Sequence, residues 1–429
     1  MKVDMAYGTS KFTADIEDKN VLGVVQSNDF KSKGTEDEVI DYALKHPISS
    51  ARLKELVHPG ETVCIVISDI TRAWQRMDKY LYKIVEELND GGVKDEDITF
   101  LSGTGTHRKQ TEEEHKKLLG EKLYERFKVI DHDCRDKDSL VYLGTTTHGT
   151  PVIVNKKAVE CDHVVLTGAI IYHFLVGWSG GRKSILPGIS SYETIMANHG
   201  LSLSDKIGAG TYPSIRSANI VNNPVHDDML QAASFIRPTF MFNVIMKDGK
   251  IVDAVSGNYL DAHARGRQIV DSIDGVKLKE RADMSIASAG GYPKDINMYQ
   301  SIKTLMNART AVKEGGTIIM ISRCNEGIGG DKDLQDIVLN YDSLLDRERN
   351  LRERYSISKY VGYYFCETAA KYNFILVADI DPNLLKRAGI KVVKTLDEAL
   401  KIAYDGKKAD DMKVYLMPHG ANTLPKFEE

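Results

Sequence analysis

Residues 63–88, which read VCIVISDITRAWQRMDKYLYKIVEEL, decide the fold class of this chain. The first five residues are apolar and rich in β-branched side chains, which predicts a buried strand. A polar loop follows, and residues 77–88 then carry apolar side chains at helical spacing. A strand, a loop and a helix in this order form the repeating unit of a mostly parallel α/β sheet.

The same alternation extends along the rest of the chain. A capping box at Thr111 opens a helix, a hairpin is expected to turn at Asp248-Gly249, and the charge-rich segment Asp331–Lys359 is expected to be helical and exposed. Further strands are expected at Ile98–Leu101, Val164–Ile171, Met284–Ala287, Thr317–Ile321, Phe374–Ala378 and Val414–Met417, and further helices at Ile296–Val312 and Leu396–Tyr404.

The length of the chain predicts more than one domain. A chain of 429 residues is too long for one ordinary core. We therefore expect two Rossmann-like α/β domains with mostly parallel sheets. The predicted N-terminal domain covers residues 1–275, and residues 412–429 are candidates to return to it. The predicted C-terminal domain covers residues 276–411.

Composition narrows the class of function. The net charge is −4 and no basic stripe is visible, which argues against a nucleic-acid partner. The five cysteines never form a CxxC pair, which argues against a disulfide framework or a thiolate zinc site and fits a reducing cytosol. The N-terminus lacks the apolar core of a signal peptide, and the most apolar long stretch, His163–Val176, is shorter than the ~20 residues of a membrane-spanning helix. We expect a cytoplasmic enzyme without a membrane partner.

The strongest motif is HFLVGWSGGRKSILPG at residues 173–188, directly after an expected buried strand. Residues 177–184 nearly match the P-loop pattern G-x-x-x-x-G-K-[ST]. Arg182, however, stands where the second glycine must let the backbone wrap around phosphates. A loop that binds a single phosphate remains open, with the amides of Ser179, Gly180 and Gly181 as donors. Lys183 is then either a counter-charge for a phosphate or a covalent attachment point.

Two shorter motifs follow the first two strands. Arg72 suits a carboxylate or a phosphate because its guanidinium gives two parallel hydrogen bonds. An Arg72–Asp69 pair that braces the loop is the structural alternative. His107 follows Gly103-Thr-Gly-Thr, whose small residues expose backbone amides, and a surface or structural histidine is the alternative.

Two further clusters lie in expected helices. Tyr299, Gln300 and Lys303 have the spacing that places side chains together on one helix, and a solvated helix face is the alternative. His199 ends the expected helix Tyr192–Asn198. It either interacts with the helix dipole or ligates a metal, although one histidine alone makes a poor zinc site.

Together these residues resemble the nickel-pincer lactate racemase family. The motif at residues 173–188 is long and specific, and the shorter motifs lie in both halves of the chain. The resemblance implies an active site in the cleft between two α/β domains, of which the N-terminal domain binds the cofactor. The cofactor it implies is nickel held by pyridinium-3-thioamide-5-thiocarboxylic acid mononucleotide, present only when the cofactor-making enzymes accompany the protein. These enzymes are the expected transient partners, and a small 2-hydroxy acid is the expected substrate.

The resemblance also implies roles for individual residues. By motif position, Lys183 would hold the nucleotide through a thioamide and His199 would ligate the nickel. His107 and His173 would be the two proton-transfer bases. The residues that would orient the substrate carboxylate or hydroxyl are Arg72, Gln300 and Lys303. The remaining cofactor contacts would come from Asp69, Ser179, Gly181, Arg182 and Tyr299.

One departure from the family concerns the substrate pocket. Many members place a tryptophan in the stretch that corresponds to residues 354–365, where this chain has tyrosines at 355, 360, 363 and 364. The identity of the 2-hydroxy acid is therefore open: lactate is expected, and malate or a sugar acid is the alternative. A non-catalytic nucleotide- or phosphate-binding protein is the alternative from another class. Two histidines disfavour it, because binding alone needs no pair of bases.

The expected chemistry accounts for these residues. The proton on the carbon beside a carboxylate is very weakly acidic, so simple deprotonation of lactate would be slow. Removal of a hydride while a base takes the hydroxyl proton gives a flat ketone instead. Return of the hydride to either face then racemises the centre and needs one base for each face. No side chain accepts a hydride, so a cofactor must supply this function.

Overall fold

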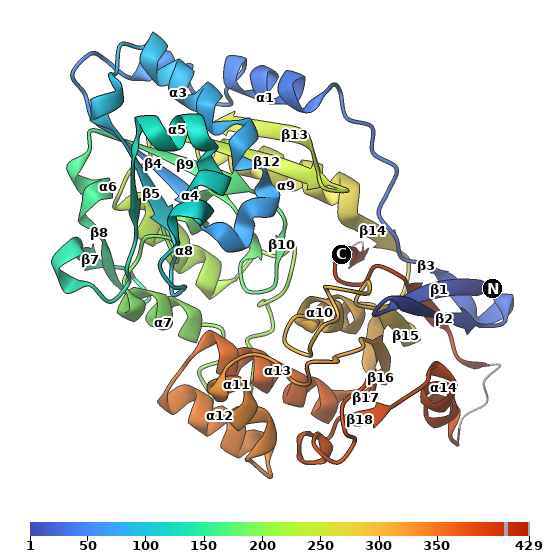
Figure 1. Ribbon diagram of the computed structural model, residues 1–429. Helices are drawn as coiled ribbons and strands as arrows, with labels where there is room; N and C mark the ends of the chain where they lie inside the picture. Colours follow the sequence, from blue (N-terminus) through green and yellow to red (C-terminus); the bar gives the residue numbers. More distant parts are fainter. Residues whose placement is uncertain (407–410, 428–429) are drawn as a thin grey trace. The chain divides into compact units, whose positions relative to one another are not determined.

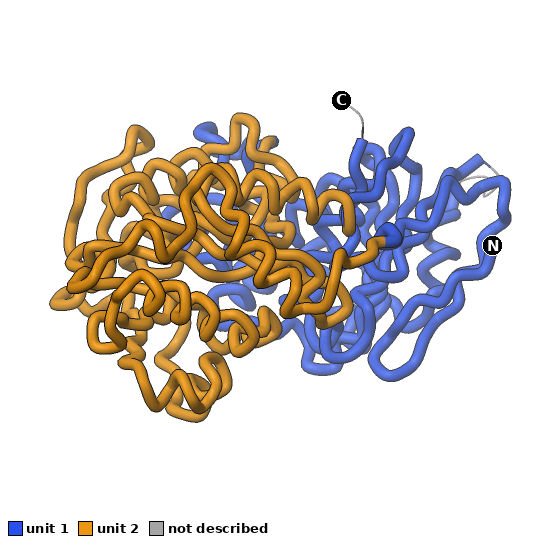
Figure 2. Tube along the Cα trace, turned by 90° about the horizontal axis from the view of Figure 1, so that it is seen from above, with its two compact units in different colours: residues 1–29, 203–213, 274–429 blue, residues 30–202, 214–273 orange. Residues whose placement is uncertain are grey.

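A computed structural model describes residues 1–406 and 411–427 of the chain (Figure 1). The contacts within it divide the chain into two compact units, which Figure 2 colours separately. Unit 1 comprises the described parts of residues 1–29, 203–213 and 274–429, and unit 2 comprises residues 30–202 and 214–273. Each unit therefore combines segments that are distant in the sequence.

This division differs from the predicted boundaries at both ends of the chain. Strand β3 (Val21–Val24) pairs in parallel with β19 (Val414–Met417), and β19 pairs with β15 (Ala282–Ser288). The free edge of β19 is thereby covered by β3, which places residues 1–29 with the C-terminal half of the chain. For the same reason, residues 412–427 lie with the C-terminal half and do not return to the N-terminal half. Residues 428–429 lie outside the described residues. Residues 407–410 of the predicted C-terminal domain also lie outside the description.

Unit 2 is built on a mostly parallel sheet with one antiparallel edge strand. Across the sheet the strands are β13 (Lys250–Gly257), β12 (Phe240–Lys247), β9 (His163–Ala169), β4 (Val63–Ser68), β5 (Ile98–Gly103) and β6 (Lys128–Asp131). Only β13 runs antiparallel to its neighbour. Alternate residues of β4, namely Val63, Ile65 and Ile67, pack into one core with α1 (Glu36–Lys45), α3 (Leu81–Asp90) and α4 (Glu112–Leu119).

The local sequence explains where these helices begin. Thr111 accepts a hydrogen bond from the Glu114 amide, and the Glu114 side chain accepts one from the Thr111 amide, so α4 starts with the predicted capping box. The predicted helix at 77–88 begins later, because Met77–Lys79 form a separate 3-10 turn before α3. Other elements of unit 2 are α2 (Leu53–Leu56), α5 (Glu121–Arg126), β7 (Leu140–Thr145), β8 (Pro151–Asn155), α6 (Lys156–Glu160), α8 (Pro224–Ser234) and α9 (Asp261–Asp274).

Unit 1 contains a fully parallel sheet. In order across it the strands are β18 (Lys391–Val393), β17 (Asn373–Val377), β16 (Val312–Ile321), β15, β19 and β3. One face packs against α14 (Leu396–Tyr404) and the hairpin of β1 (Lys2–Tyr7) and β2 (Ser10–Asp15). Strands β15–β17 also contact α10 (Ile302–Thr310) and α13 (Ile357–Lys371), and β14 (Gly275–Leu278) pairs with β20 (Leu424–Phe427). The predicted class, α/β with two mostly parallel sheets, is confirmed.

The charge-rich segment at 331–359 is helical, as predicted, but it is not fully exposed. It forms α11 (Lys332–Leu339), α12 (Leu344–Glu353) and the start of α13. Arg347 is buried because its guanidinium donates to the carbonyls of Ile337 and Val338, which caps the last turn of α11. Charge alone therefore gave a wrong prediction of exposure here.

Two buried carboxylates hold residues 203–213 within unit 1. The Gly208 amide donates to Glu348 at 3.0 Å, and the Thr211 amide donates to Glu367 at 3.0 Å. Burial acts to raise the pKa of Glu367, but the charges of Arg309 and Lys371 outweigh it and lower that pKa. The stabilisation by this carboxylate is therefore complete above the ordinary glutamate pKa, and it is lost as the pH falls through the lowered value.

Replacing Glu367 by alanine is expected to lower the free energy of unfolding by about 3–5 kcal/mol, because mostly buried Arg309 loses its carboxylate. Glu353 at the exposed end of α12 is the matched control, and Glu353→Ala is expected to stay within about 0.5 kcal/mol of wild type. Urea unfolding followed by circular dichroism measures both. Equal stability of the two variants would contradict the anchoring role of Glu367.

Candidate active site

Most candidate residues of unit 2 lie on loops at one edge of its sheet. Strands β4, β5 and β9 are parallel neighbours, so their carboxyl ends lie at the same edge. Asp69 follows β4, His107 follows β5, and the glycine-rich loop at 173–188 follows β9. Ligands of open α/β sheets bind at this edge.

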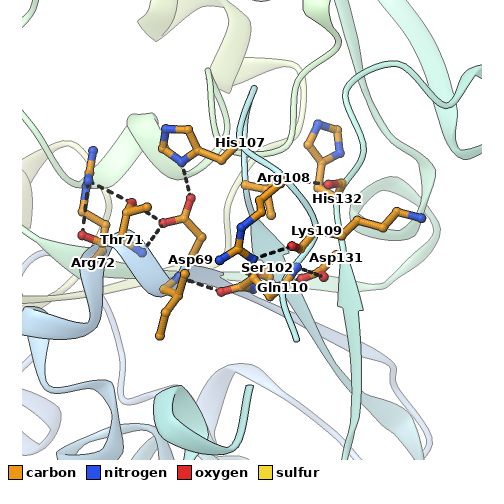
Figure 3. A network of polar contacts seen from close by, with 12 residues as sticks. Asp69, Thr71, Arg72, Ser102, His107, Arg108, Lys109, Gln110, Asp131 and His132 are labelled. Atoms are coloured by element: carbon orange, nitrogen blue, oxygen red, sulfur yellow. Dashed lines mark hydrogen bonds and ion pairs between the residues drawn. The ribbon is translucent and has the colours of Figure 1, made fainter. Parts of the chain in front are cut away.

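Asp69 and His107 form a hydrogen-bonded pair (Figure 3). His107 Nδ1 lies 2.5 Å from Asp69 Oδ2, and Asp69 Oδ1 accepts from the Thr71 amide at 2.9 Å. Burial acts to raise the pKa of Asp69, but the hydrogen bonds from His107 and Thr71 outweigh it and lower that pKa. An ionised Asp69 accepts from Nδ1–H, which makes Nε2 of His107 the atom with the free lone pair.

Arg72 lies beside this pair without joining it. Its guanidinium donates to Thr71 Oγ1 at 3.0 Å, and the residue is exposed. Among the described residues, no carboxylate forms an ion pair with Arg72, so the structural alternative of an Arg72–Asp69 brace is wrong. The side chain is available for an anionic ligand.

The glycine-rich loop uses its polar groups to hold its own shape. Ser179 Oγ donates to the Ala169 carbonyl at 3.0 Å and accepts from the Ile171 amide at 3.0 Å. The Ser179 amide donates to the Ile171 carbonyl at 2.8 Å, and the Gly181 amide donates to Asn243 Oδ1 at 2.8 Å. Two of the three amides that could bind a phosphate, those of Ser179 and Gly181, are therefore occupied within the fold, and the expected cofactor contacts of these two residues stay predictions.

Arg182 also faces the interior rather than a ligand. It is 2% exposed and donates to the carbonyls of Val176 at 3.0 Å and Trp178 at 3.4 Å. Burial, helped by the nearby charge of Arg267, lowers the pKa of Arg182 to about 9, so the guanidinium stays charged at neutral pH. Arg182 therefore fixes the loop, and its expected cofactor contact stays a prediction.

Lys183 and His173 approach each other across this loop. Lys183 Nζ lies 3.2 Å from His173 Nε2, and both side chains are half-buried. The short hairpin of β10 (Tyr172–His173) and β11 (Gly177–Trp178) places His173 opposite Gly177, and the Leu175 amide donates to His173 Nδ1 at 3.2 Å. The orientation of the His173 ring is therefore set by the backbone, with Nε2 towards Lys183.

His199 has the properties of a single metal ligand. It lies in α7 (Tyr192–Gly200), and its Nδ1 donates to the Ile195 carbonyl at 2.9 Å, so Nε2 carries the lone pair. Burial, helped by the nearby charge of Lys183, lowers the pKa of His199 to about 3 and keeps the ring neutral. Within residues 1–406 and 411–427, no group of three or more His, Cys, Asp or Glu could hold a metal. A metal at His199 would need its other ligands from a cofactor.

The loop of His107 packs directly on the loop of Lys183. The Gly105 amide donates to the Gly188 carbonyl at 2.9 Å, and the Gly188 amide donates to the Lys183 carbonyl at 3.1 Å. A side chain at Gly188 would place its Cβ 2.2 Å from the Ser184 carbonyl, so only glycine allows this approach. The fold thus joins the two loops that carry the candidate bases and the candidate attachment point.

Two family models match this chain. The lactate racemase N-terminal domain matches residues 7–210, and the lactate racemase C-terminal domain matches residues 277–424. The chain belongs to the lactate racemase family.

Similar proteins cover nearly the whole chain. A lactate racemase of Lactiplantibacillus plantarum is 33% identical and covers 99% of both chains. A lactate racemase of Thermoanaerobacterium thermosaccharolyticum is 34% identical and covers 98% of both chains. The structure of the lactate racemase apoprotein from the latter organism matches with a TM-score of 0.88 at 32% identity, covering 99% of this chain and 100% of that one. A Thermotoga maritima protein matches with a TM-score of 0.62 at 17% identity, covering 92% of this chain and 98% of that one. At this identity the match shows a shared fold alone.

In this member of the lactate racemase family, Tyr299 and Gln300 lie in a turn before α10 and not on the predicted helix. The amides of Met298 and Tyr299 donate to the carbonyls of Gly327 and Ile328, and Asn297 Oδ1 accepts from the Gln300 amide at 2.9 Å. These bonds replace the first helical turn, so α10 starts at Ile302. Lys303 lies in the first turn of α10.

The tyrosines that replace the family tryptophan are partly structural. On α13, Tyr360 is 1% exposed and Tyr363 is fully buried, and the Tyr363 hydroxyl donates to Glu348 at 3.3 Å. These two side chains therefore contribute to the core of unit 1.

Among the described residues, no helix has both the length and the apolar character needed to cross a membrane.

Sequence reasoning missed three residues that hold this site together: Asn243, Gln110 and Asp131. Asn243 is fully buried in β12, where it accepts from the loop amide of Gly181. A lone polar residue inside the apolar run Phe240–Ile245 was an available signal, because a buried amide needs a partner. No comparable signal marked Gln110 or Asp131.

Proposed function

We propose that the chain is a lactate racemase that interconverts D- and L-lactate with two histidines, His107 and His173. The observation that carries the proposal is the pairing of His107 with Asp69 beside a loop where Lys183 Nζ lies 3.2 Å from His173 Nε2. Similarity over the full chain to two proteins named lactate racemase supports it. A non-catalytic phosphate-binding protein has less support, because two of the three expected phosphate-binding amides, those of Ser179 and Gly181, are occupied.

The residues present fit the nickel-bearing nucleotide that the resemblance implies. Lys183 offers an amine for a thioamide bond, and neutral, buried His199 offers one nitrogen ligand to the metal. Because His199 has no cluster of further ligands among the described residues, the metal would have to arrive with the nucleotide. When bound, this group supplies the reversible hydride acceptor that no side chain provides.

The hydrogen bonds fix the neutral tautomer of each of the two histidines. Nδ1–H of His107 donates to Asp69, so Nε2 of His107 is ready to accept the hydroxyl proton of the substrate. Nδ1 of His173 accepts from the Leu175 amide, so in the neutral ring the proton lies on Nε2. Each turnover would need one histidine as the neutral base that takes the hydroxyl proton and the other as the imidazolium that returns a proton, and reaction of the opposite enantiomer exchanges these states.

The same geometry bears on the attachment of the cofactor. Lys183 Nζ lies 3.2 Å from His173 Nε2, and the charged amine of Lys183 must lose a proton before it can attack a cofactor. An uncharged amine is the nucleophilic form that a covalent attachment requires. His173 lies where it would influence this proton loss before the cofactor is bound, and it would serve as an acid or base afterwards.

Asp69 is better described as a positioning residue than as a cofactor contact. Its two oxygens accept from His107 and Thr71, which fixes the His107 ring and would stabilise the imidazolium that forms when a proton is taken up. Arg72 would hold the substrate carboxylate through two hydrogen bonds.

Several expectations stay predictions: the roles of Tyr299, Gln300 and Lys303, the transient contact with cofactor-making proteins and the cytoplasmic location.

Replacing either histidine by alanine is expected to lower the racemisation rate about 10²–10⁴-fold from both enantiomers, because one base starts each turnover and the other completes it. Initial rates from pure D- and pure L-lactate measure this on His107→Ala and His173→Ala. Trapped pyruvate, measured alongside, is expected to arise from opposite enantiomers in the two variants. Exposed His58→Ala is the control and should match wild type. A histidine variant that keeps the wild-type rate from both enantiomers would exclude that residue as a base.

The variant His199→Ala is expected to lose most of its nickel, because the protein offers no substitute ligand cluster among the described residues. Elemental analysis of protein produced together with the cofactor-making enzymes measures the metal, and circular dichroism confirms the fold. His163→Ala is the control, since His163 lies at the opposite end of β9 and binds Glu61. Nickel at the wild-type ratio in His199→Ala would show that the ligand lies elsewhere.

A further inference from the structure

The side chain of Gln110 connects the ends of three neighbouring strands beside the Asp69–His107 pair (Figure 3). Its Oε1 accepts from the Ile70 amide, just after β4, at 2.6 Å. Its Nε2 donates to Ser102 Oγ on β5 at 2.7 Å and to Asp131 Oδ1 on β6 at 2.9 Å. The Gln110 amide also donates to Asp131 Oδ2 at 2.8 Å, which fixes the backbone of this residue.

These contacts connect the loop that carries Asp69 to the loop that carries His107. Asp69 precedes Ile70, which donates to the Gln110 side chain, and His107 lies three residues before Gln110 on the same loop. The pairing of β4 with β5 ends at Ser68 and Gly103, so beyond this point the loops of Asp69 and His107 need further contacts to hold them together. Gln110 supplies a separate connection, so the carboxylate and the imidazole can meet without ordering their loops first.

The chemistry of the site calls for glutamine in particular. One planar carboxamide must accept from an amide on one side and donate to a hydroxyl and a carboxylate on the other. A glutamate would direct an oxygen at Asp131, and two carboxylates this close cannot both ionise readily. An apolar side chain would leave the Ile70 amide without its acceptor. The charged or titratable groups around this carboxamide are Asp131, His115, Asp69, Arg108 and Glu114.

We infer that Gln110 is a positioning residue for the reaction, which sets the separation and alignment of Asp69 and His107. The inference rests on the proposed role of His107 as a base. Among the described residues, Gln110 forms no hydrogen bond with the loop of Lys183 or with the helix of His199. Its replacement is therefore expected to impair proton transfer at His107 more than cofactor attachment or nickel binding.

The test uses three variants of the full chain, loaded by co-production with the cofactor-making enzymes. Gln110→Ala is expected to lower kcat about 10–100-fold with little change in KM and with nickel content at the wild-type level. Gln231→Ala is the matched control, because Gln231 also accepts from a backbone amide, that of Thr147, in the same unit but away from the pair. It should keep the wild-type kcat.

The conservative variant Gln110→Glu gives a readout that a purely structural role would not move. At high pH its carboxylate repels Asp131, and as the pH falls a shared proton restores the missing donor. The rate of Gln110→Glu relative to wild type is therefore expected to rise several-fold as the pH is lowered. A ratio that does not change with pH overturns the inference, and this test also decides it if Gln110→Ala fails to fold.

A second readout needs no cofactor. In apo protein labelled with ¹⁵N-histidine, the Nδ1–H signal of His107 is expected in wild type and in Gln231→Ala, and it should be lost in Gln110→Ala through exchange with water. A wild-type kcat together with a retained signal in Gln110→Ala overturns the inference. Full activity of His107→Ala would instead overturn the proposed function, so the two failures are distinguishable.

Discussion

The hydrogen bond from the Gly181 amide to Asn243 Oδ1 is the interaction on which the rest of the site depends. A glycine-rich loop has many backbone donors and few side chains, so it takes one shape only when these donors find fixed acceptors. Asn243 supplies an acceptor from inside the sheet, and Gly180 leaves the space for it, because a Cβ there would lie 2.5 Å from Asn243 Oδ1. Arg182 closes the loop from the other side through its bonds to backbone carbonyls. With the loop fixed, Lys183 is presented at a defined place beside His173.

The electrostatic arrangement follows from this scaffold. Each histidine of the site has its Nδ1 engaged by a different partner: a carboxylate for His107, a backbone amide for His173 and a backbone carbonyl for His199. These partners leave each Nε2 in a different chemical state. In the neutral rings, Nε2 of His107 has a lone pair for a proton, Nε2 of His173 carries the hydrogen, and Nε2 of His199 has a lone pair that burial keeps unprotonated. Three copies of one residue type thereby acquire three different hydrogen-bonding states through their neighbours.

The sequence indicated much of this architecture, and its failures have physical causes. Apolar runs such as Val63–Ile67 predicted the strands because burial on both faces excludes polar residues from them. Local patterns do not predict long-range strand pairing, so the sequence did not indicate that residues 1–29 belong with the C-terminal half through the pairing of β3 with β19. The motif at 173–188 located the site, but it did not show that Arg182 and Ser179 face inward, because the partners of these side chains lie elsewhere in the chain. Tyr299 shows the same limit, since hydrogen bonds to a distant loop override its helical spacing.

We propose that this scaffold presents Lys183 for covalent attachment of the cofactor. Mass spectrometry of the intact protein and of its peptides, after production with the cofactor-making enzymes, tests it most directly. We expect one nucleotide-sized increment, located on the peptide that contains Lys183 and absent from Lys183→Ala, with activity lost in the same variant. An increment on another lysine, or full activity of Lys183→Ala, would exclude Lys183 as the attachment point.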